Sequence, residues 1–160
     1  MFKKLTYIFT FFGALSINSQ DNFELNTEIP DFKLWLLDDS EITKENIKNK
    51  VVVFKFWFTS CLPCISDIPK LNALVKEFGK RSDILFIAPA LDRKPAIRKL
   101  LKRFPFQFRI AYNSMDVSAV FNKKQVYPSY FVINKKGKFV FIDSGNKQFN
   151  FFTVCYAFKQ

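Results

Sequence analysis

The clearest chemical motif in this 160-residue chain is a pair of cysteines separated by two residues, Cys61-Leu62-Pro63-Cys64. An apolar run precedes them and a helical pattern follows, so Cys61 is expected at a helix N-terminus, where free N–H groups and the helix dipole favour negative charge. That environment lowers a thiol pKa from about 8.5 and supplies a thiolate that attacks a disulfide. Cys64, one turn later, resolves the mixed disulfide, and Pro63 suits the first helical turn.

The same cysteine pair is also compatible with half of a zinc site or with a static structural disulfide. The sequence has no histidine and only one further cysteine, Cys155, so four zinc ligands cannot be assembled and no metal is expected. The missing histidines also exclude Ser-His and Cys-His catalysis. A disulfide across so short a loop adds little stability by loop closure, which favours redox chemistry. The alternative that stays open is a non-catalytic binding module with a structural disulfide.

The elements that must position the cysteines follow from hydrophobic patterning. Continuous apolar residues over 51–58 predict a buried strand, and helical spacing over 65–78 predicts a helix that kinks at Pro69 and stops at Gly79. Further strands are expected at 84–90, 108–112, 130–134 and 139–143, with helices at 93–104 and 115–121. This order predicts an α/β fold with a mixed central sheet flanked by helices. Residues 32–42 predict an additional N-terminal β-hairpin.

The composition is that of a globular protein, with 49% hydrophobic and 24% charged residues. Twenty-two residues are Phe, and we expect them to fill the core, because no nucleic-acid-binding motif accompanies them to suggest base stacking. The net charge is +11, and the basic residues are interpreted as scattered over a solvated surface. The alternative interpretation of this charge is a weak attraction to acidic partners or anionic membranes. No nucleic-acid partner is expected.

The first residues have the layout of a secretory signal peptide: Lys3 and Lys4, an apolar run over 5–17, then polar residues. The apolar run is short for a membrane span, which needs about 20 residues. We expect residues 1–19 to be removed, leaving one domain over 20–160 that is periplasmic or secreted. An uncleaved N-terminal membrane anchor is the alternative. Disulfides persist outside the cytosol, so export is consistent with redox chemistry.

Two separated segments resemble the thioredoxin-like TlpA/ResA family. They are Phe56-Trp57-Phe58-Thr59-Ser60-Cys61-Leu62-Pro63-Cys64, followed by Asp67 and Pro69, and Tyr127-Pro128-Ser129-Tyr130-Phe131-Val132-Ile133-Asn134. The likeness covers roughly residues 28–145. It implies a thioredoxin fold and a thiol–disulfide oxidoreductase that needs no cofactor, acts as a monomer and contributes to redox homeostasis. Its implied partners are thiols and disulfides of exported proteins, with cytochrome c maturation as the specific candidate pathway, and an upstream dithiol donor.

The resemblance also implies roles for single residues. Cys61 matches the family's exposed nucleophile and Cys64 its buried resolving cysteine. Pro128 matches a cis-proline that lies beside the disulfide, and the backbone of the residue before it pairs with substrate in the family. The residues expected to contact substrate are Leu62, Pro63, Tyr127 and Pro128.

Asp67 matches an acidic residue near the family's active site, and two interpretations of it stay open. It carries a proton to or from Cys64, or it only favours the first turn of a helix. Lys55 departs from the family pattern, because many thioredoxins have a buried acid six residues before the first cysteine. A lysine there could stabilise a thiolate or act as a desolvated base, which makes Lys55 a candidate modulator. The favoured interpretation is a lysine that snorkels from the sheet edge.

The C-terminal segment is a second departure from the family pattern. Relatives usually end in a helix, whereas residues 149–158 are short, aromatic and poorly patterned. Cys155 is expected to be a small buried apolar residue, with pairing between molecules as the alternative.

Overall fold

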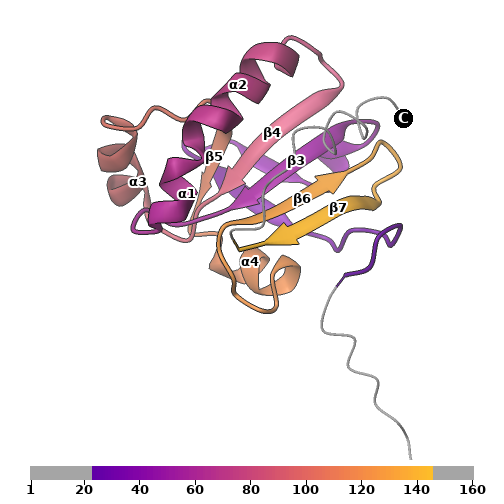
Figure 1. The fold of residues 1–160 in the computed structure, drawn as a ribbon. Helices are drawn as coiled ribbons and strands as arrows, with labels where there is room; N and C mark the ends of the chain where they lie inside the picture. Colours follow the sequence, from indigo (N-terminus) through magenta and orange to yellow (C-terminus); the bar gives the residue numbers. More distant parts are fainter. Residues whose placement is uncertain (1–22, 146–160) are drawn as a thin grey trace, which may run out of the picture.

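The structure is a computed structural model that describes residues 23–145, in which seven strands form one sheet of order β2-β1-β5-β4-β3-β6-β7 (Figure 1). The strands are β1 Lys33–Leu36, β2 Glu41–Thr43, β3 Val51–Phe56, β4 Ile84–Pro89, β5 Arg109–Tyr112, β6 Ser129–Ile133 and β7 Phe139–Ser144. The helices are η1 Glu45–Ile47 (a 3-10 turn), α1 Leu62–Ser66, α2 Ile68–Phe78, α3 Lys94–Leu101 and α4 Met115–Phe121. The predicted signal peptide 1–19, the segment 149–158 and Cys155 lie outside the described residues.

The sheet is parallel at its centre and antiparallel at both sides. β4 runs parallel to β3 and to β5, while β6 pairs antiparallel with β3 and β7 antiparallel with β6. At the other side, β1 pairs antiparallel with both β5 and β2, so that β1 and β2 form a hairpin on the sheet. The predicted α/β class with a mixed sheet and flanking helices is confirmed.

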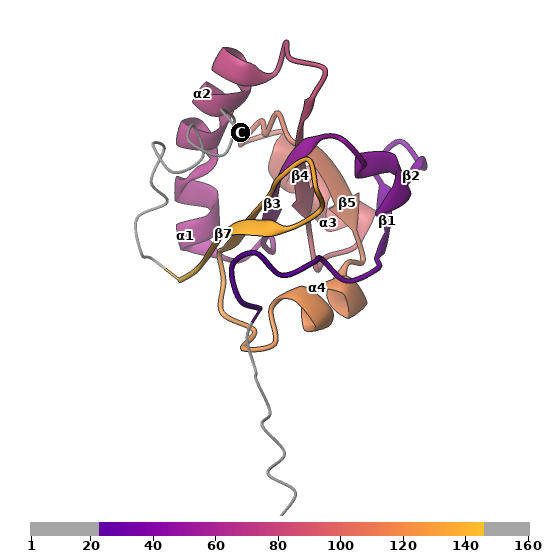
Figure 2. The same cartoon turned by 90° about the vertical axis from the view of Figure 1, so that its right-hand side faces the viewer.

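Strand β3 is buried along its whole length and divides the interior into two layers. Because side chains alternate across a strand, Val51, Val53 and Trp57 join the layer beneath α1, α2 and α3. Val52, Phe54 and Phe56 join the layer on the other face, which includes α4. In both views α4 lies apart from α1 and α2 (Figures 1 and 2). The apolar run over 51–58 therefore contains a strand that is buried on both faces, as predicted.

The layer on the α4 side is a cluster of phenylalanine rings, as the composition predicts. Phe121, 3% exposed, lies at its centre. The rings with centroids 5.6–6.1 Å from that of Phe121 are Phe23, Phe32, Phe54, Phe56, Phe131 and Phe139. Tilted and edge-on ring pairs at such distances add to the stabilisation that burial alone provides.

The helix after the cysteines differs from the prediction of one kinked helix over 65–78. It is divided at Asp67, which ends α1 and begins α2, and Pro69 lies in the first turn of α2, where a missing N–H costs little. α2 ends at Gly79, as predicted. No helix within residues 23–145 is long and apolar enough to cross a membrane.

Phe121→Ala should lower the free energy of unfolding by about 3–5 kcal/mol, because it leaves a cavity at the centre of the ring cluster. The matched control is Leu25→Ala, since Leu25 is 56% exposed, and this change should cost less than about 0.5 kcal/mol. Urea unfolding followed by fluorescence measures both values. Equal costs for the two variants would contradict the central role of Phe121.

Candidate active site

Cys61 and Cys64 form a disulfide at the start of α1, with their Cα atoms 5.2 Å apart. Cys61 is the N-cap residue of α1, and the backbone N–H of Cys64 donates to Cys61 Sγ at 3.2 Å. A hydrogen bond from a backbone N–H favours the thiolate over the thiol. Once the pair is reduced, this donor therefore favours negative charge on Cys61, as the sequence predicts for the first cysteine.

Cys61 is less exposed than the family resemblance implies, whereas Cys64 is buried as expected. Cys61 is only 5% exposed and Cys64 is fully buried, so the expectation of an exposed Cys61 is wrong for the disulfide form. Phe58 and Tyr127 pack against the core cluster that contains Cys61, with their ring centroids 5.4 Å apart. Leu62, by contrast, is 77% exposed, so the surface beside the disulfide is apolar.

The loop that leads into Cys61 is held by Asp92, a residue that the sequence analysis did not single out. Thr59 donates to Asp92 from its backbone N–H at 2.7 Å and from its hydroxyl at 2.8 Å. Asp92 follows β4, the parallel neighbour of β3, so both loops leave the sheet at the carboxyl ends of adjacent strands. This is the edge at which open α/β sheets usually place their sites, and that rule is the signal that could have identified Asp92.

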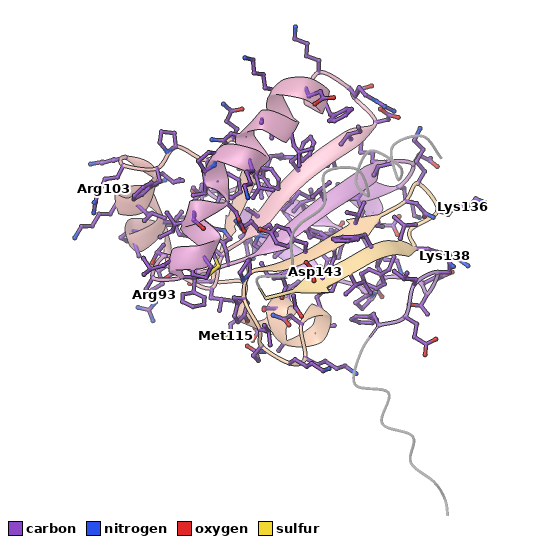
Figure 3. All side chains as sticks on the ribbon, viewed as in Figure 1. Arg93, Arg103, Met115, Lys136, Lys138 and Asp143 are labelled. Carbon is purple, nitrogen blue, oxygen red and sulfur yellow. A yellow bond between two sulfur atoms is a disulfide. The ribbon has the colours of Figure 1, made fainter. Side chains whose placement is uncertain are left out.

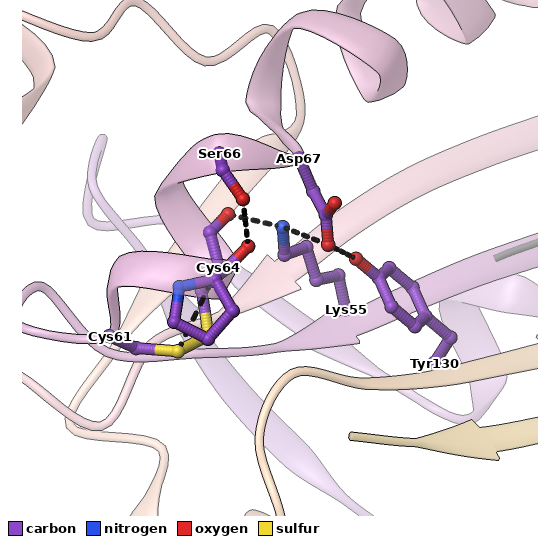
Figure 4. Close-up of polar contacts among 7 residues, drawn as sticks. Lys55, Cys61, Cys64, Ser66, Asp67 and Tyr130 are labelled. Atoms are coloured by element: carbon purple, nitrogen blue, oxygen red, sulfur yellow. Dashed lines mark hydrogen bonds and ion pairs between the residues drawn. A yellow bond between two sulfur atoms is a disulfide. The ribbon is translucent and has the colours of Figure 1, made fainter. Parts of the chain in front are cut away.

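Lys55 does not snorkel from the sheet edge as expected, because it is fully buried. The reason is its position in β3, which has β4 and β6 on its two sides, and its orientation toward α1 and α2. Its Nζ donates to the backbone oxygen of Cys64 at 2.6 Å and lies 4.0 Å from Asp67 Oδ2 (Figure 4). Phe106 and Tyr130 rings lie 5.6 and 5.5 Å from the same nitrogen, within range of a cation–π attraction.

The Asp67 carboxylate turns toward the sheet and makes no capping hydrogen bond to α2. Instead, Asp67 Oδ2 accepts a hydrogen bond from the Tyr130 hydroxyl at 2.5 Å (Figure 4). Tyr130 is the register partner of Lys55 on β6, and Asp143 is the register partner of Tyr130 on β7. The role of Tyr130 cannot be predicted from one sequence, because cross-strand register is not visible there. The side chains of Lys55, Asp67 and Tyr130 therefore form one polar network beneath the disulfide.

Burial sets the ionisation of this network. It lowers the pKa of Lys55 to about 8, against the opposing effect of the Asp67 charge. Burial also raises the pKa of Tyr130, and the hydrogen bond to Asp67 and the charges of Asp67 and Asp143 raise it further. The Tyr130 hydroxyl thus stays protonated and donating, while Lys55 can change its charge just above neutral pH.

The Tyr127–Pro128 peptide bond is cis, as the resemblance implies. Pro128 immediately precedes β6, whose Ser129 pairs with Phe56, so Pro128 lies at the edge of the sheet where the loop to Cys61 begins. The Tyr127 hydroxyl is bonded to Ser118 Oγ at 2.7 Å, which ties this segment to α4. Within residues 23–145 no group of three or more potential metal ligands occurs.

Comparison with known proteins gives a consistent result. The AhpC/TSA family matches residues 25–142. A thiol-disulfide oxidoreductase ResA of Bacillus cereus is 24% identical over 121 residues, which cover 76% of this chain and 70% of that protein. The ResA of Geobacillus thermodenitrificans is 31% identical over 111 residues, covering 68% of this chain and 63% of that protein. A Chlorobium tepidum thiol:disulfide interchange protein of the thioredoxin family superposes with a TM-score of 0.70, at 22% identity, over 84% of this chain and 98% of that one, so the fold is thioredoxin-like.

The free energy of unfolding of the oxidised protein should rise between about pH 8 and pH 10.5, and Lys55→Met should remove most of this rise. In that window the unfolded wild-type chain holds the Lys55 proton more often than the folded chain does, so wild-type stability rises with pH. Methionine has no proton to lose, so the stability of the variant relative to the wild type should fall as pH rises. Urea unfolding at pH 7 and pH 10 measures the difference. Lys76→Met, at an exposed lysine of α2, is the control, and a difference independent of pH would contradict the burial of the Lys55 charge.

Proposed function

The chain belongs to the AhpC/TSA family and is a thiol–disulfide oxidoreductase, and we propose that it works outside the cytosol with Cys61 and Cys64 as its reacting pair. The observation that carries this proposal is the Cys61–Cys64 disulfide at the start of α1, directly above a buried charged network. A disulfide that only stabilised the fold would not need an ionisable group beneath it.

The proposed reaction is two-step exchange in the reducing direction. The Cys61 thiolate attacks one sulfur of a partner disulfide, so a Cys61–partner bond forms and the partner S–S bond breaks. Cys64 then loses its proton and attacks Cys61 Sγ, which forms the Cys61–Cys64 bond and releases the second partner sulfur as a thiolate. Two electrons pass from the protein to the partner. An upstream dithiol donor reverses these steps and restores the reduced pair.

The network beneath the disulfide assists the second step. Cys64 must become a thiolate inside an apolar site, where a negative charge is costly. The Lys55 ammonium, bonded to the Cys64 backbone oxygen, supplies a compensating positive charge. Asp67 is oriented by Tyr130 and its side chain is 27% exposed, so it connects the buried site with solvent and carries the proton from Cys64. Leu62, Pro63, Tyr127 and Pro128 are the residues proposed to contact the partner.

Export is proposed from residues 1–19, which have the charge and apolar pattern of a signal peptide. An exported enzyme of this kind acts on cysteines of other exported proteins. The cysteines of apocytochromes c are the specific candidate substrate, which would place the protein in cytochrome c maturation.

Residues 20–160 should catalyse dithiol-dependent reduction of insulin disulfides, and both Cys61→Ser and Cys64→Ser should lower the rate at least 100-fold, because either change removes the exchange cycle. Turbidity of the reduced insulin chain measures the rate. If the wild type is no faster than both variants, the disulfide is structural and the chain is a binding module.

The Cys64→Ser variant also identifies the partner, since it cannot resolve the mixed disulfide on Cys61. Expressed in cells with its signal segment, it should accumulate as a covalent adduct whose partner mass spectrometry names. Recovery of the adduct from the exported fraction would support both export and the substrate class, whereas adducts only with cytosolic proteins would contradict them.

Lys55→Met should slow insulin reduction about tenfold at pH 6 to 7 and much less above pH 9. Wild-type Lys55 is charged below its pKa of about 8 and stabilises the Cys64 thiolate only in that range, and one pKa unit corresponds to a tenfold change in thiolate fraction. Rates measured from pH 6 to pH 10 test this, with Lys76→Met as the control. An equal loss at every pH would assign Lys55 a packing role only.

A further inference from the structure

Basic residues occur along the whole described chain, but the excess of basic over acidic residues is concentrated in one stretch. Positions 93–109 contain seven basic residues and no acidic one, namely Arg93, Lys94, Arg98, Lys99, Lys102, Arg103 and Arg109. The other described residues, 23–92 and 110–145, contain 14 basic and 13 acidic side chains and are nearly neutral. The excess charge of the described residues therefore belongs to α3 and the segment that follows it.

Part of this charge is already used within the protein. Lys94 forms an ion pair with Asp39, and Arg98 donates to the Leu37 backbone oxygen at 3.3 Å. The other five basic residues of this stretch are exposed and form no salt bridge with any described residue: Arg93, Lys99, Lys102, Arg103 and Arg109. Figure 3 shows Arg93 and Arg103 at the end of the molecule that carries the disulfide, with Lys136 and Lys138 at the opposite end. The net positive charge of residues 93–109 thus lies toward the end of the molecule that carries the disulfide.

A groove of about 410 Å³ joins this charge to the redox helix. One wall is formed by Ile65 and Pro69 of the α1–α2 segment, and the other by Arg103, Phe104 and Pro105. Phe104 is 38% exposed, so the groove offers an apolar ring beside a guanidinium group.

Asn72 of α2 fixes the two walls of the groove relative to each other. Its side-chain amide donates to the Pro105 oxygen at 2.8 Å and accepts from the Gln107 N–H at 2.9 Å. The groove is therefore preformed, and a ligand would not have to order it.

The groove begins one helical turn from the reacting sulfur. The Ile65 N–H donates to the Cys61 backbone oxygen at 3.1 Å, so Ile65 lies about 6 Å along the helix from Cys61. An extended peptide advances about 3.3 Å per residue. A partner whose cysteine meets Cys61 can thus place its residues two to four positions away in the groove, passing over exposed Leu62.

We propose that the groove between α1–α2 and residues 103–105, with the basic face of α3, binds an acidic segment that flanks the reacting cysteine of the partner protein. This inference rests on the proposed function and adds the partner's chemistry to it. An apolar side chain of the partner fills the groove beside Phe104, and its carboxylates face Arg103, Lys102 and Lys99. Attachment of this face to an anionic membrane is disfavoured, because it would press Leu62 and the groove against lipid and close Cys61 to partners.

Two synthetic peptides with one intramolecular disulfide each test the proposal, one with Glu and Leu beside the cysteines and one with Lys and Leu. The reduced protein should reduce the acidic peptide at least tenfold faster at low ionic strength, since charge complementarity raises association rates by 10–10³. The preference should fall strongly at 1 M NaCl, where the Debye length is about 3 Å. The variant Lys102→Glu/Arg103→Glu should lose the preference. Lys136→Glu/Lys138→Glu carries the same change in net charge at the far end and should retain it.

Each of the other outcomes contradicts the proposal and points to a different explanation. Equal loss in the two double variants would assign the preference to net charge, and equal reduction of the two peptides would remove it altogether. Sedimentation with phosphatidylserine vesicles that depends on Lys102 and Arg103, without a peptide preference, would assign the face to membranes. If insulin and both peptides all fail to be reduced, the proposed function itself fails, which separates the two conclusions.

Discussion

The rest of the active site depends on the burial of one ammonium group at the centre of the sheet. A charged amine is stable there only while its partners stay in place, and both polar partners of Lys55 belong to the segment that carries the disulfide. The Cys64 backbone oxygen and the Asp67 carboxylate lie 2.6 and 4.0 Å from its nitrogen. The break between α1 and α2 at Asp67 brings that carboxylate over the sheet. The redox turn is thus positioned by a charge as well as by apolar packing.

The side chains of β3 alternate between two faces of the sheet, one that packs in the apolar core and one that faces the disulfide. Its even-numbered side chains enter the phenylalanine layer, which contains Phe121, whereas the odd-numbered ones face the redox helix. A one-residue change of register would exchange the two sets and place Lys55 among the aromatic rings. The apolar face can therefore specify where the polar network lies, although none of its rings contacts the Lys55 nitrogen.

Sequence patterning could predict the features that depend on local order along the chain. The apolar run of β3, the helical spacing after Cys64 and the turn between β6 and β7 place the strands and helices within a few residues of those observed. The features that depend on contacts between distant segments could not be derived in this way. The central position of Lys55 depends on strand order, and the role of Tyr130 depends on its register with Lys55, and neither property is visible in the sequence. The resemblance to known relatives, not patterning, identified Pro128.

Cys61 is almost completely buried while it is bonded to Cys64, which is buried more deeply still. Under the proposed reaction, this is the form that meets the upstream dithiol donor, whose thiolate attacks one sulfur of the pair. Because the attacking sulfur and the two sulfurs of the disulfide lie nearly in line, the donor must reach a recessed Cys61 from outside the protein. A donor thiol on a protruding or flexible segment meets this requirement, whereas a thiol recessed in its own surface does not.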